Sequence, residues 1–473
     1  MAWRARTVAL VVVLASCSGV GGGSPSVPPP TSAPPALAGA PAPTNPPSPT
    51  PTPLAYLVPV TALSGPEDVA LADLARVLVP EGWEADVARI LPAAEIVPLP
   101  LTELLRRASE DPRGIALLPP DVVGPSVKTL AIDGHYFWDK DLHLDAYPLR
   151  IEGRPGSDGR DGLWELVAAG SFIFGRGVQQ RIEDVYGGDA GAALVDVRAI
   201  TRAGDLTIGT LEAPLSGNGN RYCQGCMVFV GDERYAAAVA DAGFHVLSLA
   251  GNHSGDAGPD GVLASMRALQ AADIQYFGAG PDAAAAARPL VIERRGVRIA
   301  FLGYGDVPPV DYGATETRPG HNRLEHDDAA YARVREAVAA ARRVADLVIV
   351  MPHWGIEYEP RPRPWIVDAA RAMVEAGADV IIGDHPHWIQ PIEVDRGAFI
   401  VYSVGNFVFD QMWSEETRRG TILRLSFRGP RLVAARAVPT IIEDYYRPRP
   451  LRPEEPAYRA VLDRLWRTSV TGP

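Results

Sequence analysis

Apolar runs of strand length alternate with helical stretches from residue 163 onward. The runs cover residues 163–169, 206–211, 244–249, 297–302, 346–351, 380–382 and 399–403. The helical stretches between them lie at residues 233–242, 262–271, 329–344 and 365–376. Strands that alternate with helices of this length indicate βαβ units and a largely parallel sheet covered by helices. The sequence therefore predicts an α/β fold, closed by a hairpin at residues 421–427 and 431–438 and by a terminal helix at residues 452–469.

A chain of 473 residues is too long for one ordinary domain, so we expect a second folded unit. A smaller α/β pattern before residue 163 supplies it. Its predicted strands lie at residues 56–61, 115–118 and 129–132, and its predicted helices at residues 67–78 and 101–108. We therefore expect a small α/β domain at residues 54–160 and a larger domain at residues 161–473.

The N-terminus has the pattern of an export signal. Arg4 and Arg6 precede an apolar stretch that is too short to span a bilayer. Leu14-Ala15-Ser16-Cys17 resembles the bacterial lipobox, in which the Cys is lipidated; a plain signal peptide is the alternative. Residues 18–53 are rich in Pro, Ser, Thr, Gly and Ala, which predicts a disordered tether. We expect residues 1–17 to be a lipoprotein signal and the protein to be extracytoplasmic, anchored to the membrane by lipid on Cys17.

The two remaining cysteines are Cys223 and Cys226. In an exported protein such a pair indicates a disulfide. Half of a zinc site is the alternative, although no second cysteine pair lies nearby.

The charge balance argues against nucleic acid as a partner. The chain has 45 basic and 57 acidic residues, a net charge of −12. A nucleic-acid binder needs a basic stripe or patch, and nothing in the sequence offsets the acidic excess.

Four short segments carry the side chains that suggest chemistry, at residues 209–214, 249–253, 351–355 and 383–387. Three of them follow a predicted strand, and the ends of strands are where open α/β sheets place ligands. A carboxylate, an amide oxygen and several imidazoles suit a divalent cation and a hydrolytic site. His385 and His387 are two positions apart, and on an extended stretch such side chains share one face.

Six motifs, in this order, resemble the CapA family of bacterial capsule and poly-γ-glutamate synthesis proteins. They are GSFIFGRGV at 170–178, LEAPL at 211–215, GNHSGDAG at 251–258, HWGIEY at 353–358, HPH at 385–387 and YSVGNF at 402–407. The resemblance implies a calcineurin-like metallophosphoesterase sandwich at residues 161–473. It also implies work on or with an anionic cell-surface polymer, alongside a membrane polymer synthase.

The resemblance assigns metal ligands residue by residue. Glu212 would lie between two metal positions. Asn252, His353 and His385 would complete one of them, and His387 would face the other.

It also assigns three residues that act on the substrate. His253 would stand near the scissile bond as proton donor, with Asp256 placed to orient it. Arg176 would help to hold an anionic group. An enzyme of this kind would hydrolyse an ester or amide bond with a metal-activated water.

The chain departs from the family pattern at three positions. Ser171 replaces an Asp, which deprives the position beside His387 of a carboxylate. Asp384 stands where the family usually has a His, and an Asp there can bind metal or orient a neighbouring imidazole. Thr210 replaces an Asn. We therefore expect one tightly bound divalent ion (Mn²⁺, Zn²⁺ or Fe²⁺) rather than two.

These departures leave two functions open. One is a metal-dependent hydrolase, which the set of Glu212, Asn252 and His353 with His385 favours. The other is a non-catalytic polymer-binding module with a degenerate metal site, which Ser171 favours. We expect the remaining histidines to be surface or packing residues; these are His135, His143, His245, His321 and His326.

Overall fold

The computed structural model describes residues 53–217, 223, 226–307, 312–466 and 470, all within one compact unit. The predicted signal at residues 1–17 and nearly all of the tether lie outside the described residues and stay predictions. Across the described ranges, no helix combines the length and the apolar character that crossing a membrane requires.

Residues 54–152 fold around a five-stranded sheet in the order β5-β4-β6-β2-β7. Its strands are β2 (Val58–Thr61), β4 (Arg76–Pro80), β5 (Glu95–Leu99), β6 (Ala116–Leu118) and β7 (Lys128–Thr129). The helices are α1 (Glu84–Ile90) and α2 (Leu101–Glu110), and two short pairs join β1 (Leu54–Tyr56) to β9 (Arg150–Glu152) and β3 (Asp68–Val69) to β8 (Ala131–Ile132).

The helix predicted at residues 67–78 is wrong. The segment forms β3, a 3₁₀ turn at Leu71–Asp73 and the start of β4. Val77 and Leu78 are buried in the sheet, because β4 pairs in parallel with both β5 and β6. Tertiary pairing has overridden an apolar spacing that also fits a helix.

The first of two larger sheets has the strand order β13-β12-β11-β10-β23-β24-β25, with β22 also paired to β10. Strands β10 to β13 run parallel, whereas β23 is antiparallel to β10 and to β24. The bounds are β10 (Leu163–Phe172), β11 (Leu206–Leu211), β12 (Val246–Ser248), β13 (Gln275–Phe277), β22 (Asn406–Val408), β23 (Arg419–Arg428), β24 (Arg431–Glu443) and β25 (Arg447–Pro450). The predicted closing hairpin is confirmed as β23 and β24.

The second sheet has the order β15-β16-β18-β19-β21-β20. Strands β16, β18, β19 and β21 are parallel, and the two edge strands are antiparallel to their neighbours. The bounds are β15 (Leu290–Arg294), β16 (Val297–Gly305), β18 (Leu347–His353), β19 (Val380–Ile382), β20 (Ile389–Asp395) and β21 (Ala398–Val404). A separate short pair joins β14 (Ala279–Gly280) to β17 (Gly320–His321).

The two sheets pack face to face around an apolar core. Trp164 on β10 stacks on Phe427 of β23, with ring centroids 4.6 Å apart, and both belong to the same buried cluster as Ile349 of β18 and Phe399 of β21. Each fully buried side chain of this size contributes roughly 1.5–3 kcal/mol through the hydrophobic effect. α11 (Pro456–Leu465) adds Leu465 to this core, so the predicted terminal helix is present, though shorter.

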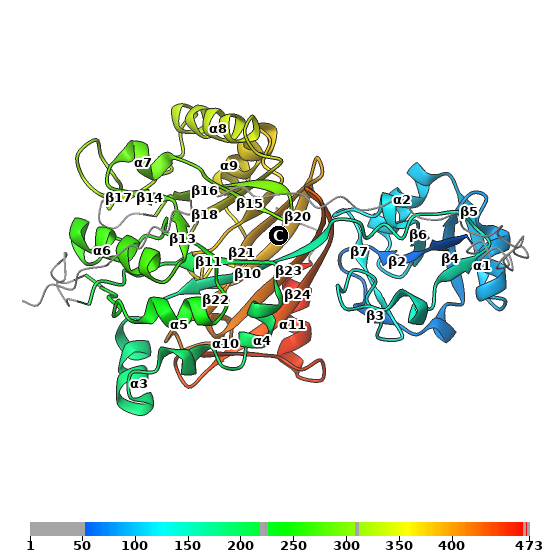
Figure 1. The fold of residues 1–473 in the computed structure, drawn as a ribbon, viewed down its shortest axis with the longest axis horizontal. Helices are drawn as coiled ribbons and strands as arrows, with labels where there is room; N and C mark the ends of the chain where they lie inside the picture. The colour runs from blue at the N-terminus through cyan, green and yellow to red at the C-terminus, as the bar shows by residue number, and fades with distance from the viewer. Residues whose placement is uncertain (1–52, 218–222, 224–225, 308–311, 467–469, 471–473) are drawn as a thin grey trace, which may run out of the picture. The chain divides into compact units, whose positions relative to one another are not determined.

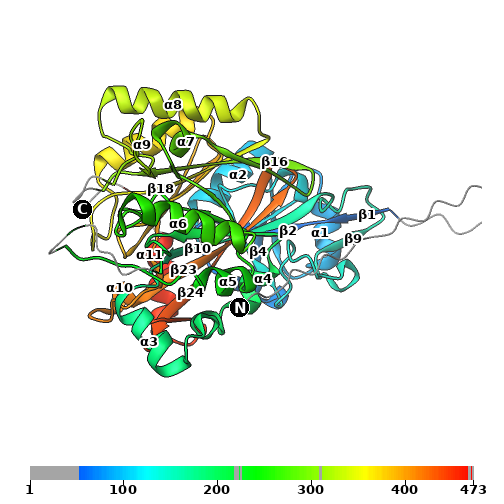
Figure 2. The same ribbon diagram turned by 60° about the vertical axis from the view of Figure 1, so that its left-hand side comes forward.

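Helices cover the outer faces of both sheets. α8 (Asp328–Arg342) and α9 (Pro364–Glu375) pack on the six-stranded sheet. α3 (Arg176–Tyr186), α5 (Tyr235–Asp241) and α6 (Gly258–Ala271) pack on the eight-stranded sheet. In both ribbon views α8 and α9 lie along the upper side, and α3 and α5 along the lower side (Figure 1, Figure 2). The predicted α/β fold is confirmed as a two-sheet sandwich between helices. The smaller helices are α4 (Arg198–Ala203), α7 (Ala283–Ala287) and α10 (Glu415–Arg418).

Candidate metal centre

The ends of parallel strands from both sheets bring the predicted ligands together. Glu212 directly follows β11 in the eight-stranded sheet, and Asn252 lies in the loop after β12. His353 is the last residue of β18 in the six-stranded sheet, and His385 follows β19. The expectation that strand ends meet at one place is therefore confirmed, and the two sheets supply two of these side chains each.

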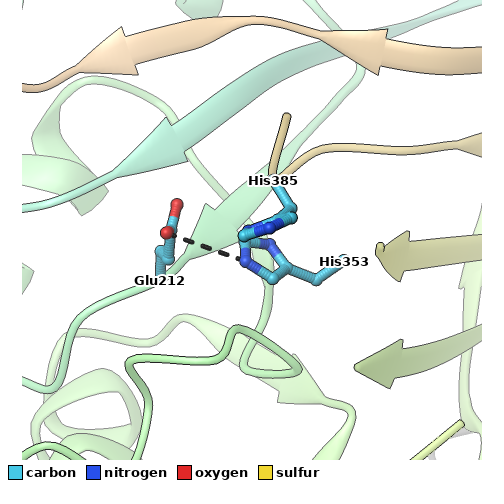
Figure 3. A group of neighbouring side chains, drawn as sticks. All are labelled: Glu212, His353 and His385. Carbon is cyan, nitrogen blue, oxygen red and sulfur yellow. Dashed lines mark ion pairs between the residues drawn. The ribbon is translucent and has the colours of Figure 1, made fainter. Parts of the chain in front are cut away.

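Glu212, His353 and His385 form a compact buried group. One ligand atom from each lies within 4.8 Å of the other two. The Nε2 atom of His353 is 3.7 Å from Oε1 of Glu212, and the three side chains point toward one another (Figure 3). Their exposed fractions are 0%, 1% and 4% respectively, so bulk water does not screen them.

This group fits a divalent cation. Both carboxylate oxygens of Glu212 and Nδ1 of His385 are buried, and none has a hydrogen-bond partner among the described residues. A buried carboxylate without hydrogen bonds is costly, and the His353 imidazole 3.7 Å away makes none to Glu212. Oxygen and nitrogen donors of this kind suit Mn²⁺, Zn²⁺ or Fe²⁺.

Asn252 lies beside the same ring nitrogen of His353. Its Oδ1 is 2.9 Å from Nε2 of His353, so the amide oxygen and the imidazole nitrogen are in hydrogen-bond contact. Gly251 makes this approach possible, because a Cβ there would lie 2.9 Å from the Cα atom of Glu212. Glycine is the residue that permits such close backbone contact.

Asp384 fixes the other edge of the His353 ring. Its Oδ1 is 2.8 Å from Nδ1 of His353, and its Oδ2 accepts a hydrogen bond of 3.0 Å from Oγ of Ser171. A carboxylate on Nδ1 holds an imidazole with Nε2 directed at a metal. Of the two roles expected for Asp384, the contacts favour orientation of a neighbouring imidazole.

The ionisation of His353 and His385 differs in direction. Burial disfavours the charged form of His353, but the negative charges of Asp384 and Glu212 outweigh it and raise the pKa of His353 to about 9. Burial lowers the pKa of His385 well below its ordinary value, and the nearby His353 and His387 act in the same direction. His385 is thus a neutral donor at physiological pH, in the form that binds metal.

His387 lies next to this group but is held by other partners. Its Nδ1 is 2.9 Å from Oδ1 of Asn406, and its Nε2 is 3.7 Å from Oε1 of Glu357. The expected extended His-x-His stretch is wrong: the segment is a bend in which His385 and His387 have φ values of +91° and +59°. The bend nevertheless keeps the two ring centroids 5.7 Å apart.

His253 and Asp256 pair as the family resemblance implied. Nδ1 of His253 is 2.8 Å from Oδ2 of Asp256, and the same carboxylate oxygen accepts a 2.6 Å hydrogen bond from the backbone N–H of Phe229. The Phe229 ring packs edge-on against the imidazole, with centroids 4.5 Å apart. These contacts leave Nε2 of His253 as the nitrogen that can exchange a proton with a bound molecule.

Arg176 does not line the same hollow as His253. Its guanidinium pairs with the carboxylate of Asp410 and lies over the Phe229 ring. Its backbone has a φ of +51°, which is uncommon for a residue with a side chain. The Phe229 ring therefore lies between Arg176 and His253, and the charge of Arg176 is paired with Asp410.

A cleft of about 970 Å³ opens over the centre. It is lined by Asn252, His253 and His385 of the predicted site and by Cys226, Met227, Asp306, Val307, His326, Gly355, Ile356, Glu357 and Trp365. The predicted disulfide between Cys223 and Cys226 is confirmed, and it places Cys226 at the edge of this cleft.

Sequence reasoning missed Asp306 and misjudged His326. Nε2 of His326 is 2.9 Å from Oδ2 of Asp306, and this buried carboxylate also accepts from the backbone N–H of Gly355. The backbone N–H of Asp306 donates to the carbonyl of His353. The pair therefore holds the segment after β18, so His326 does more than the surface or packing residue that we expected. A carboxylate at the end of β16 was the signal available in the sequence.

The other histidines lie elsewhere. His245 is a packed strand-edge residue, as expected, and its Nδ1 accepts a hydrogen bond from the N–H of Thr207. His321 is buried on β17. His143 is exposed and His135 half-buried in the N-terminal region.

Comparisons with known proteins agree with this geometry. The chain is 33% identical over 282 residues to the capsule biosynthesis protein CapA of Bacillus anthracis, covering 59% of this chain and 67% of that protein. It is 33% identical over 256 residues to the PGA biosynthesis protein CapA of Bacillus subtilis, covering 54% of this chain and 65% of that protein. A hypothetical protein of Thermus thermophilus has a crystal structure that aligns with a TM-score of 0.38 at 16% identity, over 58% of this chain and 98% of that one.

The family model described as bacterial capsule synthesis protein PGA_cap matches residues 165–411, more than half of the chain. All of the predicted metal ligands and both members of the His253–Asp256 pair lie inside the matched range. The chain belongs to the bacterial capsule synthesis protein PGA_cap family.

Proposed function

We propose that this protein acts in the synthesis, export or anchoring of an anionic cell-surface polymer of the poly-γ-glutamate kind. We also propose that it hydrolyses an ester or amide bond at a single-metal centre. In this proposal the protein is extracytoplasmic, held to the membrane by lipid on Cys17, and works beside a membrane polymer synthase. Support comes from family membership and from the two CapA relatives, whose names refer to capsule and PGA biosynthesis.

One observation carries the hydrolytic part: Glu212 is fully buried, and neither of its oxygens has a hydrogen-bond partner among the described residues. A buried carboxylate without hydrogen bonds is costly, and a bound cation would compensate it. His353 and His385 supply nitrogen donors within reach, and the cleft admits a substrate to the same place.

Each residue has a role in this proposal. Glu212, Asn252, His353 and His385 hold the ion, which when bound supplies positive charge and Lewis acidity. Asp384 orients His353. His253 gives a proton to the leaving group through Nε2, since Asp256 holds its Nδ1. Arg176 lines a neighbouring hollow that shares Cys226 and Met227 with the cleft, and there it would help to hold an anionic group.

The test is metal content together with hydrolysis by the mature, full-length chain. We expect about one tightly held ion per chain by plasma mass spectrometry, hydrolysis of γ-linked glutamate oligomers, and weak turnover of generic phosphoesters. His353→Ala should abolish both the metal and the activity. His245→Ala, in the same fold but outside the centre, should retain both. A protein that takes up no metal under any loading condition would contradict the hydrolytic proposal.

A specific observation favours a second candidate. The Ser171 hydroxyl donates to Asp384 and provides no carboxylate to a metal. A polymer-binding module without catalysis would have the same cleft and no need for a complete centre. It would bind γ-linked glutamate oligomers equally well before and after chelation, whereas a metal-dependent site would lose affinity when the ion is removed.

A further inference from the structure

Two residues 213 positions apart in the sequence form a buried contact beside the candidate centre. Ser171 lies at the end of β10 in one sheet, and Asp384 lies just after β19 in the other. The Ser171 Oγ donates to Oδ2 of Asp384 over 3.0 Å, and both side chains are buried. This contact joins the two sheets directly behind the ring of His353.

Both carboxylate oxygens of Asp384 are thereby engaged. The first faces Nδ1 of His353 at 2.8 Å, and the second accepts from Ser171. The backbone is fixed as well, because the N–H of Trp354 donates to the carbonyl of Asp384 and the N–H of Asp384 donates to the carbonyl of Pro352. These contacts hold both the backbone and the carboxylate of Asp384 in place. Each carboxylate oxygen already has a partner, so neither is directed at a metal position.

We propose that Asp384 is a positioning residue for His353 and that Ser171 is the partner that locks it. Asp384 sets the orientation of His353 so that Nε2 faces Glu212 and Asn252, 3.7 Å and 2.9 Å away. Ser171 and Asp384 act as one unit, which restricts the centre to one ion. This inference rests on the proposed metal centre and identifies what tunes it.

The pairing has a consequence for substitutions at residue 171. A carboxylate there has no hydrogen to donate to Asp384, so it would replace the Ser171 hydrogen bond by a contact between two acceptors. Ser171→Asp alone should therefore weaken the centre rather than add a second ion. In the combination of Ser171→Asp with Asp384→Asn, the Asn amide can donate to the new carboxylate, so metal affinity should rise above that of Ser171→Asp.

The experiment compares wild type, Asp384→Asn, Ser171→Asp and the double variant, each as the full-length chain. Titration with Mn²⁺ or Zn²⁺ measures affinity and stoichiometry, and the visible bands of the Co²⁺-loaded protein report the ligand field. Asp384→Asn keeps a hydrogen-bond acceptor for His353 but loses its charge, so affinity should fall about 10–100-fold. Its Co²⁺ bands should shift while the stoichiometry stays at one.

Asp379→Asn is the matched control. Asp379 lies just before β19 and accepts from Arg342 and from the N–H of Val348, far along the strand from His353. This variant should lower the unfolding midpoint without altering metal affinity or the Co²⁺ bands. A merely structural role for Asp384 would make the two variants behave alike.

The outcomes separate the two proposals. The positioning role is overturned if Asp384→Asn leaves the metal affinity unchanged. It is also overturned if wild type binds two ions and Asp384→Asn binds one. A double variant that binds no better than Ser171→Asp overturns the coupling of the two residues. A wild type that binds none of Mn²⁺, Zn²⁺ and Co²⁺ would instead contradict the proposed metal centre itself.

Discussion

At the scale of single residues, Glu212 has the least ordinary environment in the described chain. Other buried carboxylates have partners, as Glu165 does in its pair with the guanidinium of Arg424. Glu212 has only the imidazole nitrogen of His353 at 3.7 Å. Without a bound ion the buried Glu212 carboxylate is unfavourable, so an ion that binds to it should stabilise the fold markedly.

Metal should therefore raise the stability of wild type and leave Glu212→Gln unaffected. An ion at a hundred times its Kd adds about 2.7 kcal/mol to the free energy of unfolding. Thermal unfolding with and without Mn²⁺ or Zn²⁺ measures this increment. Glu165→Gln breaks a different buried pair, so it should lower the melting temperature yet keep the increment. Equal increments in wild type and Glu212→Gln would place the ion elsewhere.

Metal affinity should rise with pH because His353 must lose a proton to bind. In the metal-stripped protein the pKa of His353 is raised to about 9, above its ordinary value, so protonation stabilises the fold below that ordinary value. That contribution is lost as the pH rises through 9. Competition titrations from pH 7 to 9 should show an affinity increase of about tenfold per unit, with a plateau above pH 9. A flat profile would mean that His353 is neutral before the ion binds.

At the scale of elements, the centre depends on how closely the loop after β12 approaches the end of β11. Gly251 lies against Glu212, and a Cβ there would meet two of its carbon atoms at 2.9 and 3.1 Å. The nearer atom belongs to the backbone, so it cannot move aside as a flexible side chain would.

Gly251→Ala should consequently displace Asn252 from Glu212. Overpacking of this kind costs about 1–3 kcal/mol of stability, and we expect metal affinity to fall with it. Chemical unfolding and metal titration measure the two effects. Gly124→Ala is the control, because nothing lies within 4 Å of the added Cβ, and it should leave both quantities unchanged.

Local pattern predicted the elements that hold the site better than it predicted the contacts. Apolar runs ending at Leu211 and Ile382 match β11 and β19 to the residue, because both strands are buried on two faces. The helix predicted at residues 67–78 failed, because pairing with β5 and β6 places the end of this segment in β4. The pairing of Asp306 with His326 could not be predicted, because isolated polar residues in different loops carry no periodic signal.

At the scale of the whole molecule, the chain's location is a prediction from its N-terminus. If Cys17 carries lipid, Cys17→Ala should move the exported protein from the membrane fraction to the soluble fraction. Fractionation followed by immunoblotting measures this. Cys223→Ala is the comparison, because it removes a cysteine of the disulfide and should leave the membrane association intact. Wild type found wholly in the soluble fraction would contradict the lipid anchor.

Because the proposed ligands are divided between two sheets, an ion bound by them would link the sheets. Glu212 and Asn252 follow strands of the eight-stranded sheet, whereas His353 ends a strand and His385 follows a strand of the six-stranded sheet, so one ion would bridge the two sheets. Removal of the ion by a chelator should then loosen the strand ends of both sheets together. Hydrogen–deuterium exchange should accelerate in parallel at the ends of β11 and β18, while the far ends of the same strands remain protected by the core that the sheets share.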